Sequence, residues 1–207
     1  MNMKYEVIFM TPGTFCHFFP VILLALTAYL PGSAMAEDTL PHTSKELGFR
    51  LRYPASWSIS PETGANLRLK IVSPINMPAA YCSVVVKKYP NAKTAKQGEI
   101  DAVFQEQPSP EEIRDILSKG TIGVEVVKAS SGTLGSRPAH VAWVRYQEET
   151  ALGPAAVYGR VAMTATPGLT WTLACSSQGI DPGDAERNYT LWNNEINGIF
   201  SSFTLPQ

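Results

Sequence analysis

Cysteine and histidine are scarce in this sequence, whose 207 residues contain three of each. No Cys-x-x-Cys pair occurs, and His42 and His140 are isolated, which excludes the usual spacings of a zinc site. The Gly-x-Ser-x-Gly, His-Glu-x-x-His, Walker and dinucleotide-binding glycine patterns are missing as well. We therefore predict no catalytic residue, no metal ligand and no cofactor, and expect that the protein is not an enzyme.

The sequence also lacks an excess of charge of either sign. Lysine and arginine number 17, aspartate and glutamate number 18, and the net charge is −1. Because no run of basic residues is present, nucleic acid is a poor candidate for a partner. Beyond the N-terminal segment no apolar run reaches the ~20 residues that a membrane-spanning helix needs, so no further span is expected.

What the N-terminus does contain is an export signal. Residues 15–30 are mostly apolar, and their cleanest part, residues 21–26, is too short to cross a bilayer. A Pro-Gly-Ser break follows, and then the small-x-small pattern that ends at Ala36. This pattern predicts a signal peptide over residues 1–36 with cleavage after Ala36, although an uncleaved anchor is the alternative. We expect a periplasmic or secreted protein.

The remaining chain has the length of one domain. Residues 37–46 are polar, contain a proline and show no periodicity, so they predict a short flexible leader. The pattern changes at residue 47, and we expect a single folded domain over residues 47–207.

Two cysteines remain after the signal peptide, and both lie in segments of alternating apolar residues. In an oxidising compartment Cys82 and Cys175 are candidates for a disulfide. Such a bond would close a loop of about ninety residues and stabilise the fold by ~4–5 kcal/mol in the chain-entropy model. The alternative is a pair of buried free thiols.

Period-two alternation predicts seven strands. They cover residues 49–53, 67–71, 81–89, 122–126, 139–147, 156–164 and 169–176. Capping patterns predict one helix from Thr94 and another after Ser109 that Gly120 ends. A long apolar stripe predicts one final helix from Pro182 to Phe203. This order favours an α+β sandwich around an antiparallel sheet.

The large aromatic residues are the remaining candidates for a binding surface. Trp57, Trp171 and Trp192 share apolar faces with their neighbours, which favours burial in the core. The residues from His140 to Tyr146 alternate between two faces of one strand. Our candidate binding residues divide between these faces: Trp143 and Arg145 on one, His140 and Tyr146 on the other.

Two other site types stay open on the sequence alone. Carboxylates at Glu148 and Glu149, or in the turn from Asp181 to Asp184, could contribute to a calcium site, because hard oxygen ligands leave no sharp motif. A hydrolase would have to use His140 as its base, and the alternative is a histidine that is hydrogen-bonded within the sheet.

Residues 49–57, with the sequence FRLRYPASW, resemble the opening of PsbP-like domains, where an apolar strand runs into Tyr-Pro-x-x-Trp. The later order of elements is similar, including a terminal helix with a tryptophan and a final Phe-x-x-Phe. The resemblance covers roughly residues 47–205. It implies an α/β/α sandwich with a central antiparallel sheet.

The PsbP-like family includes photosystem II extrinsic subunits, DcrB-like exported bacterial proteins and a nuclear Ran-binding relative. Its members resemble binding or assembly modules. The lipid-attachment cysteine of DcrB-like proteins is missing here, the cysteine pair departs from the plainest family pattern, and no metal site carries over. The resemblance implies an exported accessory domain that binds a protein partner in the cell envelope. A small-ligand or calcium-binding protein is the alternative, and a hydrolase is the third.

Overall fold

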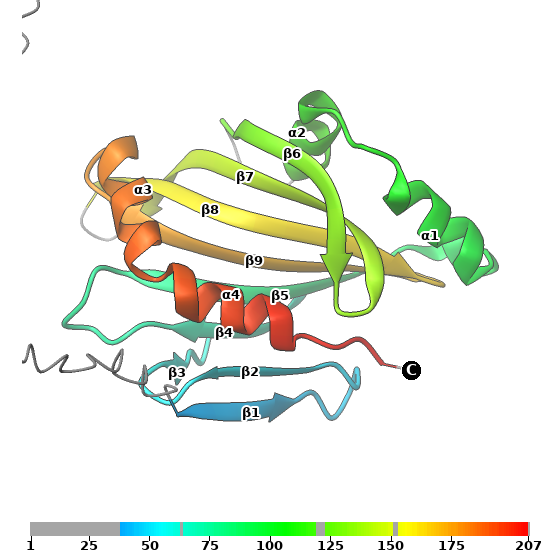
Figure 1. Ribbon diagram of the computed structural model, residues 1–207, viewed down its shortest axis with the longest axis horizontal. Coiled ribbons are helices and arrows are strands. Elements are labelled where there is room, and N and C mark those ends of the chain that lie inside the picture. The colour runs from blue at the N-terminus through cyan, green and yellow to red at the C-terminus, as the bar shows by residue number, and fades with distance from the viewer. Residues whose placement is uncertain (1–37, 63, 119–122, 151–152, 207) are drawn as a thin grey trace, which may run out of the picture. The chain divides into compact units, whose positions relative to one another are not determined.

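The computed structural model describes residues 38–62, 64–118, 123–150 and 153–206. A seven-stranded antiparallel sheet, in the order β3-β4-β5-β9-β8-β7-β6, forms its centre (Figure 1). The strands are β3 (Ser58–Ile59), β4 (Leu67–Val72), β5 (Ala80–Lys88), β6 (Glu125–Leu134), β7 (Arg137–Thr150), β8 (Gly153–Thr166) and β9 (Leu169–Gly179). The predicted meander of four consecutive antiparallel strands is confirmed as β6 to β9. The bounds of its first strand were wrong, because β6 runs from Glu125 to Leu134 rather than over residues 122–126.

Helices cover both faces of the sheet, so the predicted α/β/α sandwich is confirmed. On one face lie α1 (Gln97–Gln105), which follows the short 3₁₀ turn η1 (Pro90–Ala92), and α2 (Pro110–Ser118). On the other face lie α3 (Pro182–Leu191), which contacts β8 and β9, and α4 (Asn193–Ser202). None of the helices in the described ranges is both long enough and apolar enough to cross a bilayer.

The N-terminal segment of the domain is a strand rather than a flexible leader. Residues of β1 (Thr39–Thr43) pair antiparallel with β2 (Arg50–Pro54) in a separate two-stranded sheet. The prediction of an unstructured leader over residues 37–46 is therefore wrong for β1. The reason is that the strand is held by its partner: its own side chains are mostly exposed, so no apolar alternation marks it.

The final helical region is interrupted. A single helix from Pro182 to Phe203 was expected, but α3 ends at Leu191 and α4 begins at Asn193. Between them Trp192 has φ −100° and ψ 10°, outside the helical region. Its indole Nε1 donates to the carbonyl oxygen of Pro78 at 2.9 Å, a tertiary contact that holds the junction in place.

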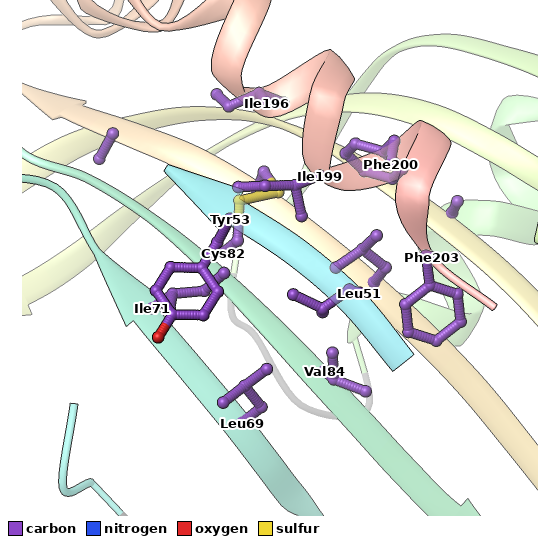
Figure 2. Packing of buried hydrophobic residues seen from close by; sticks show 14 of the residues in the cluster. Leu51, Tyr53, Leu69, Ile71, Cys82, Val84, Ile196, Ile199, Phe200 and Phe203 are labelled. Atoms are coloured by element: carbon purple, nitrogen blue, oxygen red, sulfur yellow. A yellow bond between two sulfur atoms is a disulfide. The ribbon is translucent and has the colours of Figure 1, made fainter. Parts of the chain in front are cut away.

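The main core lies between the sheet and the layer formed by β2, α3 and α4 (Figure 2). Figure 2 shows side chains of β2 between α4 and the strands β4 and β5. The core residues labelled there are Leu51, Tyr53, Leu69, Ile71, Cys82, Val84, Ile196, Ile199, Phe200 and Phe203. Trp57, Trp171 and Trp192 are buried in the same core, as predicted.

The predicted disulfide between Cys82 and Cys175 is present. The two residues are direct register partners on β5 and β9, and both are fully buried. The bond joins positions 93 residues apart in the chain and lies beneath α4 in the main core. It therefore connects the N-terminal strands covalently to the C-terminal meander.

Side-chain caps mark where α1 and α2 begin. At α2, Ser109 Oγ accepts from the Glu112 backbone N–H and Glu112 Oε2 accepts from the Ser109 N–H, which confirms the predicted capping box. At α1 the predicted box from Thr94 is wrong. The helix begins at Gln97, and Glu99 Oε2 accepts from the N–H of Lys96. The predicted stop at Gly120 lies outside the described residues.

A side chain covers part of the outer edge of the sheet. The carboxamide of Gln107, in the connection between α1 and α2, donates to the carbonyl of Ala129 at 2.9 Å and accepts from the N–H of Ser131 at 3.2 Å. Both partners belong to β6, the last strand of the sheet. One side chain therefore makes the two hydrogen bonds that a further strand would make at this point.

Candidate functional site: a cationic ladder on the sheet

The register of the meander places two cationic side chains on either side of a tryptophan. Lys128 of β6 pairs with Trp143 of β7, and Trp143 pairs with Arg160 of β8. Lys128 Nζ lies 5.2 Å from the centre of the Trp143 ring, and Arg160 Cζ lies 5.5 Å from it. Both distances suit cation–π contacts. We call these three residues the cationic ladder.

The surroundings of Arg160 hold its guanidinium in a fixed position. Its Cζ lies 4.3 Å from the centre of the Phe200 ring, and its Nη1 donates to Asn197 Oδ1 at 3.2 Å, so α4 forms one wall of the ladder. Burial lowers the pKa of Arg160. Its Nε is buried without a hydrogen-bond partner among the described residues. Arg160 therefore carries a partly desolvated positive charge that its neighbours do not neutralise.

The neighbouring arginine, Arg145, differs from the cations of the ladder because it has a carboxylate partner. Arg145 pairs in register with Tyr158 and forms an ion pair with Glu186 of α3 at 2.7 Å. The hydrogen bond to Glu186 raises the pKa of Arg145. Within the described ranges, by contrast, neither Lys128 nor Arg160 has a carboxylate at ion-pair distance. Lys128 is exposed and Arg160 is half-buried, so the ladder combines a solvated charge with a partly desolvated one.

The four residues that the sequence offered as a binding surface do not lie together. Trp143 and Arg145 face the α3–α4 side of the sheet, and Trp143 is half-buried at the margin of the main core. His140 and Tyr146 face the α1–α2 side, as their spacing predicted. The structure adds Lys128 and Arg160 to the first pair, and neither had been predicted. Arg160 did leave a signal, since a lone arginine inside an apolar strand is unusual.

The side chain of His140 contacts the end of α1. Its ring centroid lies 4.8 Å from that of Phe104, and its Nε2 lies 3.3 Å from the carbonyl oxygen of Val103. These contacts fix the helix against β7. The second contact engages Nε2, one of the two ring nitrogens that a hydrolase could use as its base.

Tyr146 belongs to a hydrogen-bonded group that ties three strands together. Its hydroxyl lies 3.2 Å from that of Tyr81 on β5, and Tyr81 donates to Glu148 Oε2 at 3.0 Å. Gln178 of β9 donates to the same carboxylate oxygen at 3.1 Å. Burial raises the pKa of both tyrosines. Tyr81 has no local signal in the sequence, because its contact with Tyr146 depends on the strand order.

Of the carboxylates considered for calcium, Glu148, Asp181 and Asp184 have other partners, and Glu149 is exposed. Glu148 accepts the two hydrogen bonds just described, and Asp181 Oδ1 accepts from the N–H of Asp184 as the cap of α3. Asp184 in turn accepts from the N–H of Ile180 and pairs with Arg187. In the part of the chain that the structure describes, no group of three or more His, Cys, Asp and Glu side chains is placed to hold a metal ion.

Comparison with solved structures identifies the fold. Over 84% of this chain and 96% of the other, it is similar to the cyanobacterial PsbP protein (CyanoP) from Synechocystis sp. PCC 6803, with a TM-score of 0.51 and 15% identity. The chain therefore has the PsbP-like fold that residues 49–57 suggested. No protein-family model matches the sequence, and no curated protein sequence matches it.

Two further structures match with lower TM-scores. The Saccharomyces cerevisiae Ran-binding protein Mog1p has a TM-score of 0.49 and 10% identity over 82% of this chain and 96% of that one. LpqN of Mycobacterium tuberculosis, involved in cell envelope biogenesis, has a TM-score of 0.45 and 15% identity over 83% of this chain and 88% of that one.

Proposed function

We propose that this protein is an exported accessory module that binds an acidic segment of a protein partner in the cell envelope. The cationic ladder is the proposed contact surface. The observation that carries the proposal is the partly desolvated guanidinium of Arg160, which lies beside the half-buried ring of Trp143 and has no carboxylate partner among the described residues. A binding role rather than catalysis accounts for this arrangement.

The chemistry of the ladder favours a carboxylate-bearing partner. A guanidinium binds carboxylates with charge-assisted hydrogen bonds, and Arg160 is already oriented by Phe200 and Asn197, so little side-chain entropy is lost on binding. Tryptophan and arginine are also the residues that most often dominate protein–protein affinity. Lys128 adds an exposed charge on the other side of the Trp143 ring.

Export is supported by independent features. The N-terminal sequence ends in a signal-peptidase pattern at Ala36. The buried disulfide between Cys82 and Cys175 suits an oxidising compartment. A folded, disulfide-bonded domain after a signal sequence fits a role in the periplasm or outside the cell.

Site-specific cross-linking in intact cells tests the proposal. The full chain would carry a photoreactive benzophenone amino acid at position 128 or, as a control, at position 87. Lys87 is also exposed, but it lies on β5 and faces the opposite side of the sheet. We expect one envelope protein to be captured from position 128 and not from position 87. Equal capture from both positions would contradict a role for the ladder.

Charge variants then measure the contribution of the ladder. Against the captured partner, Arg160→Gln and Lys128→Gln should each weaken binding by about tenfold, and the salt dependence of the affinity should decrease. Lys87→Gln removes the same charge elsewhere and should change the affinity less than about twofold. An equal effect of Lys87→Gln would show that only overall charge matters.

A further inference from the structure

Four large apolar side chains are exposed at one end of the domain. Ile75 is fully exposed, Ile180 is 91% exposed and Leu191 is 63% exposed, while Met77 is about half exposed. They come from three segments: the β4–β5 connection, the β9–α3 turn and the end of α3. We call these residues the apolar end. Exposed apolar surfaces mark sites of contact with another protein or with a membrane.

Hydrogen bonds hold the three segments of the apolar end together. Trp192 Nε1, next to Leu191, donates to the carbonyl of Pro78 in the β4–β5 connection. The N–H of Gln178, at the end of β9, donates to the carbonyl of Ala79 at 3.1 Å. The side chain of Asn188 in α3 donates to the carbonyl of Gln178 at 2.8 Å. These hydrogen bonds fix the three segments relative to one another, so the apolar end does not depend on the conformation of a single loop.

The chain enters the domain at this same end. The N–H of Ala55 donates to the carbonyl of Asp38 at 2.7 Å, immediately before β1. The ring of Trp57 then meets that of Trp192, with centroids 5.3 Å apart. Figure 1 shows the start of β1, the β4–β5 connection and α3 at the left of the view. Whatever precedes residue 38 is therefore attached beside the apolar end.

The sequence before residue 38 carries the apolar run of residues 15–30. Only residues 31–38 separate this run from the folded domain, and a fully extended stretch of that length reaches roughly 28 Å. If the apolar run enters the bilayer during export, this link limits the distance between residue 38 and the membrane to roughly that length until the signal peptide is cleaved. A bilayer surface is also the occupant whose chemistry suits aliphatic side chains from separate turns.

We propose that the apolar end rests on the surface of a phospholipid bilayer, with Ile75, Met77, Ile180 and Leu191 inserted among the lipids. This contact orients the domain on the membrane that its N-terminal segment reaches. It does not require the segment to stay attached, because the four side chains belong to the folded domain itself. The surface is separate from the cationic ladder, so the two proposals can fail independently.

The test is photo-cross-linking of the full chain in the cells that export it. A benzophenone amino acid replaces Ile180 or, as a control, Ile116, an exposed apolar residue of α2 on the α1–α2 face of the sheet. We expect phospholipid adducts on the peptide that contains position 180 and none on the peptide that contains position 116. A protein adduct at position 180, including one with a second copy of this chain, or the lack of any adduct there, would overturn the proposal.

A second set of variants tests whether the apolar side chains cause the contact. With the probe at position 77, the double variant Ile75→Ser/Ile180→Ser should lower the yield of lipid adduct by at least about tenfold, since the burial of even one aliphatic side chain changes partitioning by roughly that factor. The matched variant Val103→Ser/Ile116→Ser also removes two exposed apolar residues and should leave the yield unchanged. Equal losses in both variants would contradict the proposal.

Discussion

The indole rings of Trp57 and Trp192 meet edge to face, with their centroids 5.3 Å apart and their planes at 87°. Both rings are buried, but their polar atoms differ in environment. The Nε1 of Trp192 donates to the carbonyl of Pro78, whereas the Nε1 of Trp57 has no partner among the described residues. The two tryptophans therefore allow the contribution of the indole hydrogen bond to stability to be compared in the same part of the core.

Replacing each tryptophan by phenylalanine should separate the hydrogen bond from the ring packing. Trp192→Phe leaves the Pro78 carbonyl without its indole donor, and we expect it to lower the free energy of unfolding by about 1 kcal/mol more than Trp57→Phe does. Denaturant unfolding of the two variants measures the difference. A larger loss in Trp57→Phe would contradict the assignment.

Removal of the disulfide should destabilise the protein strongly. The bond spans 93 residues, so the double variant Cys82→Ala/Cys175→Ala should lose about 4 kcal/mol of unfolding free energy, because its unfolded chain gains loop entropy. Cys82→Ser/Cys175→Ser should lose more, since it buries two hydroxyl groups as well. Guanidinium unfolding under oxidising conditions measures both variants, and a loss below about 1 kcal/mol would show that native contacts alone hold the strands.

The tyrosines on the α1–α2 face predict a loss of stability at alkaline pH. Burial raises the pKa of Tyr81 and Tyr146 above the ordinary value of 10.0. Their neutral forms stabilise the fold fully below about pH 10, the unfolded pKa, and this contribution is lost as the pH rises further. Urea unfolding at pH 8 and pH 11 should show the decrease, and Tyr81→Phe should show a smaller one. The absorbance of tyrosinate, followed as the pH of the folded protein is raised, gives a check. Titration of all tyrosines at their ordinary pKa in the folded state would contradict the prediction.

Arg160 should contribute little to stability although it is central to the proposed function. Its guanidinium is partly desolvated and its neighbours supply no carboxylate within the described ranges, so the cation–π contacts are offset by the cost of burial. Arg160→Met keeps much of the packing and should change the unfolding free energy by less than about 1 kcal/mol. Thermal and urea unfolding measure this. A loss of several kcal/mol would make Arg160 a structural residue.

The sequence predicted β7, β8 and β9 well, because each carries a long run of apolar and β-branched residues between turn signals. It missed most of β6, whose small polar residues from Ser130 to Thr133 are paired with β7 and lack an apolar pattern. It predicted the pairing of Cys82 with Cys175 from compartment and strand position. It failed for β1, whose exposed side chains carry no period, and for the break at Trp192, where the apolar spacing continues through both helices. A local pattern does not report hydrogen bonds to a distant carbonyl such as that of Pro78.

The candidate surface was predicted only in part for a related reason. Alternation along one strand assigned Trp143 and Arg145 to one face and His140 and Tyr146 to the other. It did not reveal which residues of neighbouring strands stand beside Trp143. Lys128 and Arg160 become its neighbours only through the register of β6 and β8, which long-range pairing determines.

The carboxamide of Gln107 also affects whether separate molecules can associate through the edge of the sheet. By occupying the Ala129 carbonyl and the Ser131 N–H, it ends the sheet where another molecule's strand could otherwise continue it. The Gln107 side chain therefore opposes polymerisation by strand addition at this part of β6. Gln107→Ala would remove both hydrogen bonds without changing a core residue. Light scattering of concentrated samples of this variant should then rise with time, whereas the parent protein should stay monodisperse.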